Sequence, residues 1–344
     1  MDDRRRPPSR LRYHATGDAR PMPAGRVAQV GLVAFLVAGL LNADSLYGQA
    51  NRQPFGWKRD VARAAVWPFR TLSHATGLDE PRRAIQDAIG RDEPVAEDAR
   101  RSGISRTPSA DLSEQPPGFS LRRPTAGEPL RVWVGGDSMA QVYGQSVVAA
   151  CEERGTLDCT LDYRISTGLT RPDFFDWPAH LADEVLPSEP EVMIIMFGAN
   201  DAQGMELASG VHQVRDQEWQ DEYRKRVGET MDLLAGDGRL VIWVGQPPMK
   251  KTDFDERMNI LNVIYAEQAL NRPWVRFLDS GPVLSTDGGY QAYLPDGSGE
   301  EELARNNDGI HLTRFGGDRL SDATLDLLDA AIAESTSPQP DPGD

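Results

Sequence analysis

The chain has 344 residues, a formal net charge of −16, 39% hydrophobic residues and seven tryptophans. This length accommodates one large domain with extensions, or two small domains, and the apolar content is sufficient for a buried core. The acidic balance argues against a surface for nucleic acid or for anionic membranes on the main domain, because both need excess positive charge.

The N-terminal region differs from the rest. Residues 1–26 form a basic leader with seven arginines against three aspartates, and residues 27–41 are almost continuously apolar. This positive-inside pattern predicts a cytoplasmic N-terminus and a transmembrane helix over residues 27–47. The apolar run over residues 27–41 is shorter than the roughly 20 residues that a full span needs. A signal peptide cleaved near residues 48–50 is therefore one alternative, and a buried core helix is another. Either of the first two places the remaining chain outside the cytoplasm, on the membrane or secreted.

The region that follows divides by composition. Residues 48–90 contain short runs with helical spacing, which predict a helical stalk. Residues 91–128 are rich in Ser, Pro, Arg, Glu and Asp, and residues 336–344 are Pro-rich and acidic. Both compositions are typical of disordered segments, a linker and a tail. The folded domain is therefore expected over residues 129–335.

Strand-like apolar runs alternate with helix-like stretches throughout that domain. We expect strands at residues 130–135, 159–165, 192–197, 240–245 and 275–278, and helices at residues 140–154, 177–186, 219–234, 254–270 and 313–333. This alternation predicts an α/β fold, a three-layer α/β/α sandwich around a mainly five-stranded parallel sheet. In such sheets, ligands bind at the carboxyl ends of the strands.

Three motifs converge on that edge. Residues 136–138 (Gly-Asp-Ser) follow the first strand, residues 198–201 (Gly-Ala-Asn-Asp) follow the third, and residues 308–311 (Asp-Gly-Ile-His) precede the last helix. Serine, amide, acid and base are the parts of an acyl-transfer site. Taken alone, a serine in this position is more often a helix N-cap than a nucleophile, and a Gly-Ala-Asn-Asp run after a strand is often just a turn. Their convergence favours catalysis.

His311 is the best candidate base among the five histidines. Asp308 precedes it by three residues, so that acid and base can share one side of a turn. By contrast, His180 and His212 lie in sequence contexts with no acid at a comparable spacing. We therefore expect His311 to act on Ser138.

These motifs resemble those of the SGNH (GDSL-type) hydrolases. Residues 136–138 are similar to the first block, with Met139 where leucine is usual, and residues 198–201 and 308–311 match the third and fifth blocks. Gly168 is the natural counterpart of the second-block glycine. The resemblance covers residues 130 to 335, about the whole predicted domain. Residues 171–177 and 245–249, which flank these blocks, resemble a bacterial membrane-attached branch catalogued only as a domain of unknown function.

The resemblance implies a flavodoxin-like SGNH fold and a role for each motif residue. Ser138 would be the nucleophile, His311 its base and Asp308 the residue that orients the imidazole. The backbone N–H groups of Ser138 and Gly168 and the side-chain amide of Asn200 would form the oxyanion hole. No cofactor is implied, and no metal, because neither histidine nor cysteine spacing makes a ligand set.

Residues near the motifs are candidates for further roles. Arg171, Trp177 and Asp201 are candidate substrate-binding residues, with Trp177 as part of a sugar-stacking wall. A core position is the alternative for Trp177, and Asp137 and Asp201 are also suited to tying loops together.

Cys151 and Cys159 are the only cysteines. They are predicted to form a disulfide if the domain is exported and to remain buried thiols if it is cytoplasmic.

The function predicted from the sequence is that of an extracytoplasmic serine esterase. It would be attached to the membrane by its N-terminal helix, bind no nucleic acid, and remove acetyl or short acyl groups from cell-envelope glycans. An O-acyltransferase to a cell-surface polysaccharide would use the same residues. A non-catalytic glycan-binding or assembly protein is the alternative from another class.

Overall fold

The structure, a computed structural model, describes residues 23–53, 55–77 and 118–336. The predicted leader and tail lie almost entirely outside these residues, as does most of the predicted linker. The chain divides into two compact units: Met1–Tyr47 with Val66–Arg91, and Gly48–Ala65 with Asp92–Asp344.

A parallel sheet forms the centre of the larger unit. Its strands are β1 (Leu130–Gly136), β2 (Leu157–Tyr163), β3 (Val192–Met196), β6 (Leu240–Val244) and β7 (Val275–Leu278), in the order β2-β1-β3-β6-β7. Every neighbouring pair is parallel. All residues of β3 and β6 are buried, which is typical of strands covered on both faces. The flavodoxin-like order confirms the predicted fold.

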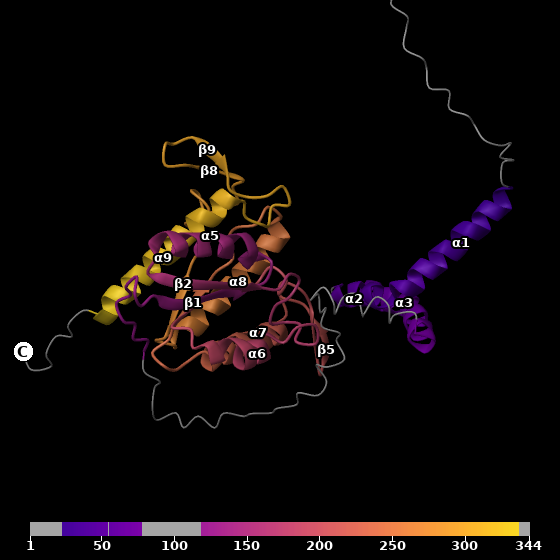
Figure 1. The fold of residues 1–344 in the computed structure, drawn as a ribbon, viewed down its shortest axis with the longest axis horizontal. Helices are drawn as coiled ribbons and strands as arrows, with labels where there is room; N and C mark the ends of the chain where they lie inside the picture. Colours follow the sequence, from indigo (N-terminus) through magenta and orange to yellow (C-terminus); the bar gives the residue numbers. More distant parts are fainter. Residues whose placement is uncertain (1–22, 54, 78–117, 337–344) are drawn as a thin grey trace, which may run out of the picture. The chain divides into compact units, whose positions relative to one another are not determined.

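Helices cover both faces of this sheet (Figure 1). The helices are α5 (Met139–Arg154), α6 (Trp177–His180), α7 (Gln217–Leu233), α8 (Thr252–Leu270) and α9 (Arg314–Thr336). Helices α5 and α9 pack together on one face, α6 and α7 lie on the other, and α8 packs against α7. Short π-helical and 3₁₀ segments continue α6 to residue 188. Each predicted strand and helix of the sandwich is present, with its ends within three residues of the expected positions.

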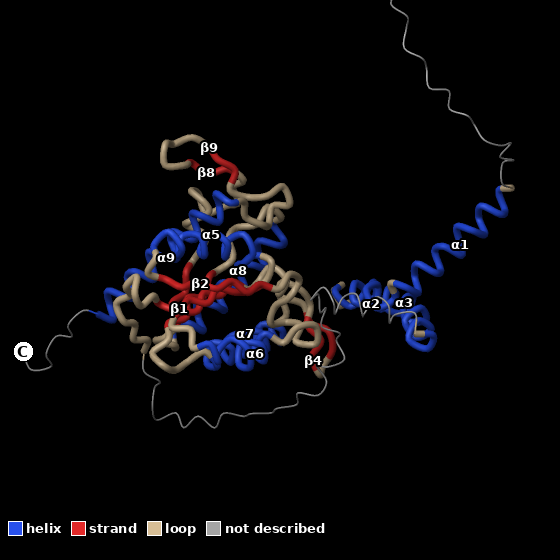
Figure 2. Tube along the Cα trace, in the orientation of Figure 1, coloured by secondary structure: helices blue, strands red, loops and turns tan. Residues whose placement is uncertain are grey.

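Two short hairpins have no counterpart among the predicted elements. Strand β4 (Met205–Leu207) pairs with β5 (Gly210–His212), and β8 (Tyr293–Pro295) pairs with β9 (Glu301–Leu303). The hairpin of β8 and β9 stands away from the central sheet (Figure 2). Strands of three residues are too short to show an alternating pattern, so pairing rather than sequence defines them.

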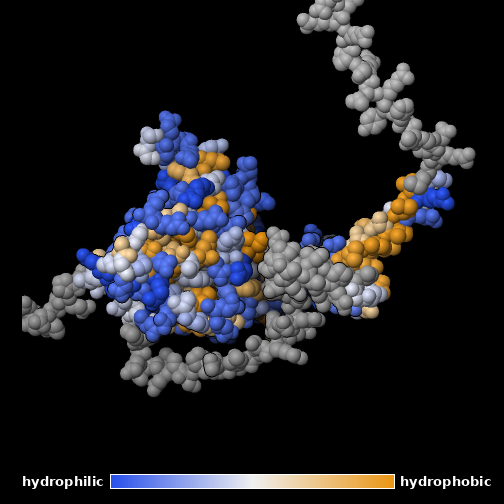
Figure 3. Space-filling view, viewed as in Figure 1, coloured by the Kyte–Doolittle hydropathy of each residue, from blue (hydrophilic) through white to orange (hydrophobic). Residues whose placement is uncertain are grey.

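The N-terminal described residues form α1 (Ala24–Leu41), α2 (Ala43–Arg52) and α3 (Trp57–Thr76). Among the described residues, α1 is the one helix long and apolar enough to cross a membrane, with 18 residues and a mean hydropathy of 1.8. None of its residues is buried, and Figure 3 shows apolar surface along it. The transmembrane helix over residues 27–47 stays a prediction; α1 ends within this range and α2 begins at Ala43. Asn42 is the C-cap of α1, and its backbone N–H and side-chain amide both donate to the Ala38 carbonyl.

The segment Gly48–Ala65 groups with the larger unit, although its sequence predicts a stalk. Arg171 donates to a backbone carbonyl of this segment at 3.0 Å, and Arg59 lies 3.8 Å from the Asp173 carboxylate. The Phe55 ring lies 4.2 Å from the Arg59 guanidinium and 4.5 Å from that of Arg171. Cation–π and ionic contacts therefore fasten the segment to the loop that begins at Arg171.

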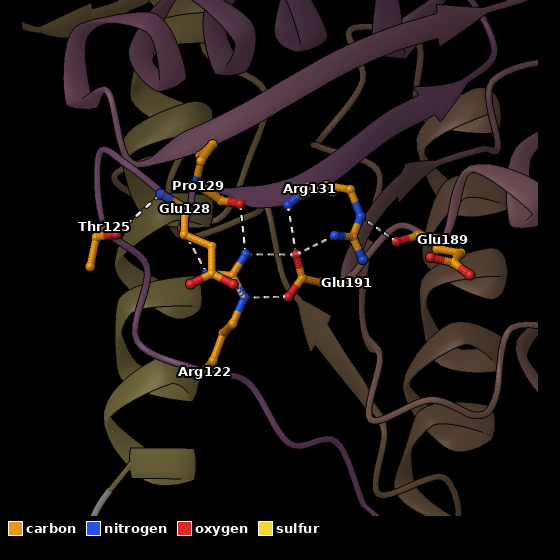
Figure 4. A network of polar contacts seen from close by, with 7 residues as sticks. All are labelled: Arg122, Thr125, Glu128, Pro129, Arg131, Glu189 and Glu191. Carbon is orange, nitrogen blue, oxygen red and sulfur yellow. Dashed lines mark hydrogen bonds and ion pairs between the residues drawn. The ribbon is translucent and has the colours of Figure 1, made fainter.

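The described chain resumes at residue 118, ahead of the predicted domain boundary. Arg122 anchors this segment (Figure 4): it donates to the two carboxylate oxygens of Glu191 at 2.9 and 3.1 Å and to two nearby backbone carbonyls at 2.6 and 2.7 Å. Glu191 also accepts from the backbone N–H of Arg131 at 3.0 Å. Residues 118–128 thus pack on the domain, although their composition is that of a linker.

Cys151, in α5, and Cys159, in β2, form a disulfide, which confirms the predicted bridge.

Candidate active site

Ser138 lies at the carboxyl end of β1, in the N-cap position of α5. The turn requires Gly136, whose φ is +149°, because a Cβ there would lie 2.1 Å from the carbonyl oxygen of Met196. A serine at an N-cap usually bonds the first helical turn, but the Ser138 side chain makes no capping bond. Its Oγ lies instead 2.9 Å from Nε2 of His311. The side-chain N-cap interpretation is therefore wrong.

Asp308 completes this chain of hydrogen bonds. Its Oδ2 lies 2.7 Å from Nδ1 of His311, and its Oδ1 accepts from the backbone N–H groups of Ile310 and His311 at 2.8 and 3.0 Å. Burial raises the pKa of Asp308, but the hydrogen bonds from the His311 ring and from these N–H groups outweigh it, so the pKa is lowered overall. The carboxylate is thus held ionised against Nδ1.

The two loops with the predicted oxyanion donors meet at a buried carboxylate. Asp201 accepts from the backbone N–H and the hydroxyl of Thr170 at 2.8 and 2.9 Å, which joins the Gly168 loop to the loop after β3. A Cβ at Gly168 would lie 2.2 Å from Asp201 Oδ1, so this close approach requires glycine. In the loop after β3, the backbone N–H and the side-chain Nδ2 of Asn200 each lie 3.4 Å from Asp137 Oδ2.

Asn200→Ala is expected to lower kcat about 10²–10³-fold, because one oxyanion donor is removed. The KM for a small ester and the thermal midpoint should change little, since Nδ2 makes only a long contact with Asp137. Initial-rate kinetics with p-nitrophenyl acetate measure this effect. An unchanged kcat would show that Asn200 is not a donor to the oxyanion.

Asp137 supports both sides of the site from a fully buried position. It accepts from the backbone N–H groups of Met139 at 2.8 Å, Gly198 at 3.2 Å and Asn200 at 3.4 Å. Burial raises the pKa of Asp137 to about 6, and these hydrogen bonds oppose the rise. The structure agrees with the prediction that Asp137 and Asp201 tie loops together.

The raised pKa of Asp137 predicts a pH-dependent stability. The unfolded chain ionises this group near 3.8 and the folded chain near 6, so its stabilising contribution is present below about pH 4 and is lost as the pH rises to about 6. In Asp137→Asn, this component should be absent. Urea unfolding from pH 4 to 7 measures the difference, and identical pH profiles for both proteins would contradict the prediction.

The proposed substrate contacts of Arg171, Trp177 and Asp201 are not supported, because all three side chains are buried. Trp177 is fully enclosed, and its Nε1 donates to the Thr167 hydroxyl at 2.9 Å. Arg171 forms a bidentate ion pair with Asp173 at 2.8 and 2.9 Å. These side chains make internal contacts in and around the Gly168 loop, and they do not line a surface open to substrate.

His180 and His212, whose sequence contexts showed no acid at a spacing comparable to that of Asp308, both have acid partners in the structure. His180 Nε2 lies 2.6 Å from Asp162, a residue of β2 that precedes it by 18 positions. For His212, Nε2 lies 2.8 Å from Ser209 Oγ and Nδ1 lies 2.8 Å from Glu218. The Asp162 contact joins distant positions, but His180 Nδ1 also lies 3.3 Å from Glu184, four residues further on. Both partners of His212 are its near neighbours in sequence.

Ser209, His212 and Glu218 therefore form a second serine–histidine–acid chain, in a different setting. Ser209 is exposed in the turn between β4 and β5, and the Glu218 side chain is 63% exposed. Ser138, by contrast, lies at the carboxyl edge of the parallel sheet, where such folds bind their ligands. Among the described residues, no group of three or more His, Cys, Asp and Glu is placed to hold a metal ion.

A parallel sheet with Ser, His and Asp hydrogen-bonded at its carboxyl edge is an arrangement that α/β serine hydrolases use. Residues 131–327 match the family described as "Protein of unknown function (DUF459)". The chain belongs to this family, as expected from the resemblance to a branch of unknown function. No curated protein matches the chain in sequence.

Solved structures with a similar fold include three bacterial hydrolases. A lipase/acylhydrolase from Enterococcus faecalis is 16% identical, with a TM-score of 0.44 and coverage of 59% of this chain and 96% of that one. A GDSL-like lipase from Bacteroides thetaiotaomicron is 15% identical, with a TM-score of 0.40 and coverage of 61% and 93%. An acetyl xylan esterase from Geobacillus stearothermophilus is 16% identical, with a TM-score of 0.41 and coverage of 57% and 93%.

Proposed function

We propose that this protein is an extracytoplasmic serine esterase of the SGNH type that removes acetyl or short acyl groups from cell-envelope glycans. The observation that carries the proposal is the hydrogen-bonded chain from Ser138 Oγ to His311 at 2.9 Å and from His311 to Asp308 at 2.7 Å. An imidazole held in this way by a carboxylate deprotonates a serine hydroxyl as it attacks a carbonyl carbon.

The residues act in two steps. Ser138 Oγ attacks the ester carbonyl while His311 Nε2 takes its proton, and Asp308 keeps the other proton on Nδ1. The Asn200 amide and the backbone N–H groups of Ser138 and Gly168 stabilise the oxyanion. His311 then protonates the leaving alcohol, which leaves an acyl-serine. Water, deprotonated by His311, hydrolyses that ester and regenerates the hydroxyl.

Two features support a location outside the cytoplasm. The apolar helix α1 follows a leader with seven arginines, which favours a cytoplasmic N-terminus and an exported domain. The Cys151–Cys159 disulfide is typical of oxidising compartments. A C-terminal reporter enzyme that is active only outside the cytoplasm tests this location. Its inactivity in an expressed, membrane-bound fusion would contradict the proposed orientation.

A helix that holds the enzyme at a membrane favours a substrate that is fixed at the same surface. Esterified glycans of the cell envelope meet that requirement, and their acyl groups are esters of sugar hydroxyls. We therefore assign O-acylated glycan as the substrate class.

Acetate release from O-acetylated peptidoglycan and from an O-acetylated polysaccharide tests this assignment. The detergent-solubilised full chain should release acetate, and Ser138→Ala should not. Transfer of the acetyl group to an added oligosaccharide, faster than release to water, would instead establish the O-acyltransferase. Glycan binding without turnover, unchanged in Ser138→Ala, would establish the binding protein.

A further inference from the structure

Arg305 is a fully buried arginine at the start of the loop that carries the acid and the base, three residues before Asp308. Its Nη1 donates to the carbonyl of Pro248 at 2.7 Å, and its Nη2 donates to the carbonyl of Ile310 at 2.8 Å. Nη2 also lies 3.3 Å from the Met249 sulfur, and the guanidinium lies 5.2 Å from the centre of the Tyr290 ring. One side chain thus joins the loop after β6 to Ile310, which directly precedes His311.

Arg305 is a buried cation whose hydrogen-bonding partners include two backbone carbonyls and no carboxylate among the described residues. Burial lowers the pKa of Arg305 to about 10, so the group remains charged at neutral pH. Among the described residues, no carboxylate forms an ion pair with it within 4.0 Å, and its Nε has no hydrogen-bond partner. A buried charge is costly, and the bonds that the guanidinium donates to the carbonyls of Pro248 and Ile310 are what it offers in return.

The hydrogen bonds of the Asp308–His311 loop indicate what the Arg305 guanidinium contributes. The internal bonds of the loop are local: the backbone N–H of Asn306 donates to the His311 carbonyl at 2.8 Å, and the Gly309 N–H donates to the Asn306 carbonyl at 2.9 Å. These bonds keep the loop compact but do not fix its place on the sheet. Within the part of the chain that the structure describes, hydrogen bonds join it to the loop after β6 from Lys250 N–H to the Gly309 carbonyl, at 3.1 Å, and through the Arg305 side chain.

We propose that Arg305 is a positioning residue that holds the Asp308–His311 loop against the loop after β6 and so keeps His311 within hydrogen-bonding distance of Ser138. The inference rests on the proposed esterase function for its kinetic readout. The guanidinium contacts no substrate. Its effect is transmitted through the Ile310 carbonyl, one residue before His311.

Arg305→Met in the full chain tests the proposal. Methionine fills the space but donates no hydrogen bond, so we expect kcat for p-nitrophenyl acetate to fall about 10²-fold, with KM within about twofold of wild type. Arg305→Lys, which can reach one of the two carbonyls, should recover part of that loss. A buried arginine at the amino end of β6 provides the control: Arg239 bonds the carbonyls of Pro190 and Leu234 at 2.8 and 3.0 Å. Arg239→Met should leave kcat unchanged.

A spectroscopic readout separates this proposal from the proposed function. The proton between His311 Nδ1 and Asp308 should give a low-field NMR signal in wild type and in Arg239→Met, and it should be shifted or lost in Arg305→Met. That pattern supports the positioning role even if the wild type hydrolyses no ester. The proposal is overturned if folded Arg305→Met keeps both the low-field signal and the wild-type kcat. It is also overturned if Arg239→Met lowers kcat, or weakens the signal, as much as Arg305→Met does. If Arg305→Met does not fold, Arg305→Lys is judged by the same two criteria.

Discussion

Ser138→Ala is expected to lower kcat for ester hydrolysis about 10⁶-fold, the loss seen when the nucleophile of a serine triad is removed. The reason is that no other hydroxyl occupies the position 2.9 Å from His311 Nε2 among the described residues. The fold should be retained, because the Ser138 side chain makes no helix-capping bond. Initial rates with p-nitrophenyl acetate, with thermal melting of both proteins, measure the change.

Ser209→Ala is the matched control for this substitution. Ser209 also lies 2.8 Å from a histidine that contacts an acid. Its substitution therefore tests whether a serine hydrogen-bonded in this way is sufficient for ester hydrolysis. We expect a wild-type kcat, because Ser209 lies in an exposed hairpin turn and not at the carboxyl end of a strand of the central sheet. A large loss in Ser209→Ala, with turnover retained in Ser138→Ala, would move the active site to the hairpin.

Asp308→Asn is expected to lower kcat about 10⁴-fold while the geometry of the loop is kept. The asparagine oxygen can still accept from the backbone N–H groups of Ile310 and His311, as Oδ1 does now at 2.8 and 3.0 Å. Its amide would then face His311 Nδ1 and donate to it, which places the ring proton on Nε2. In that tautomer, His311 cannot accept the proton of Ser138.

The kinetics of Asp308→Asn should be compared with those of Asp296→Asn. Asp296 also accepts from nearby backbone N–H groups, but in the exposed turn between β8 and β9. The same change of carboxylate to amide should there leave kcat unaltered. If Asp308→Asn kept kcat within tenfold of wild type, His311 would not depend on this carboxylate for its tautomer.

The sandwich and the main site were predictable because their signals are local. Strands buried on both faces read as solid apolar runs, and each motif lies within four residues at the end of one element. Parallel strand order then brings Ser138 and Asn200 to one edge. Asp308 and His311 are neighbours on one loop, so their 2.7 Å contact needs no tertiary information.

What could not be predicted depends on contacts between distant segments. The acid partner of His180 is on β2, and Arg171 bonds a segment 120 residues earlier in the chain. Arg305 lies only three residues before Asp308, but its burial and its bond to Pro248 are invisible in the sequence. The buried indole of Trp177 similarly depends on a fold that encloses it.

Covalent labelling tests the central claim most directly, because it identifies the nucleophile without assuming a substrate. The full chain should be treated with a fluorophosphonate, reduced and digested with trypsin, and the modified residue located by mass spectrometry. We predict a single adduct on Ser138, in the peptide of residues 132–154, and its loss in His311→Ala. An adduct on a different serine such as Ser209, or no adduct on the folded wild-type protein, would contradict the assignment of Ser138 as a serine-hydrolase nucleophile.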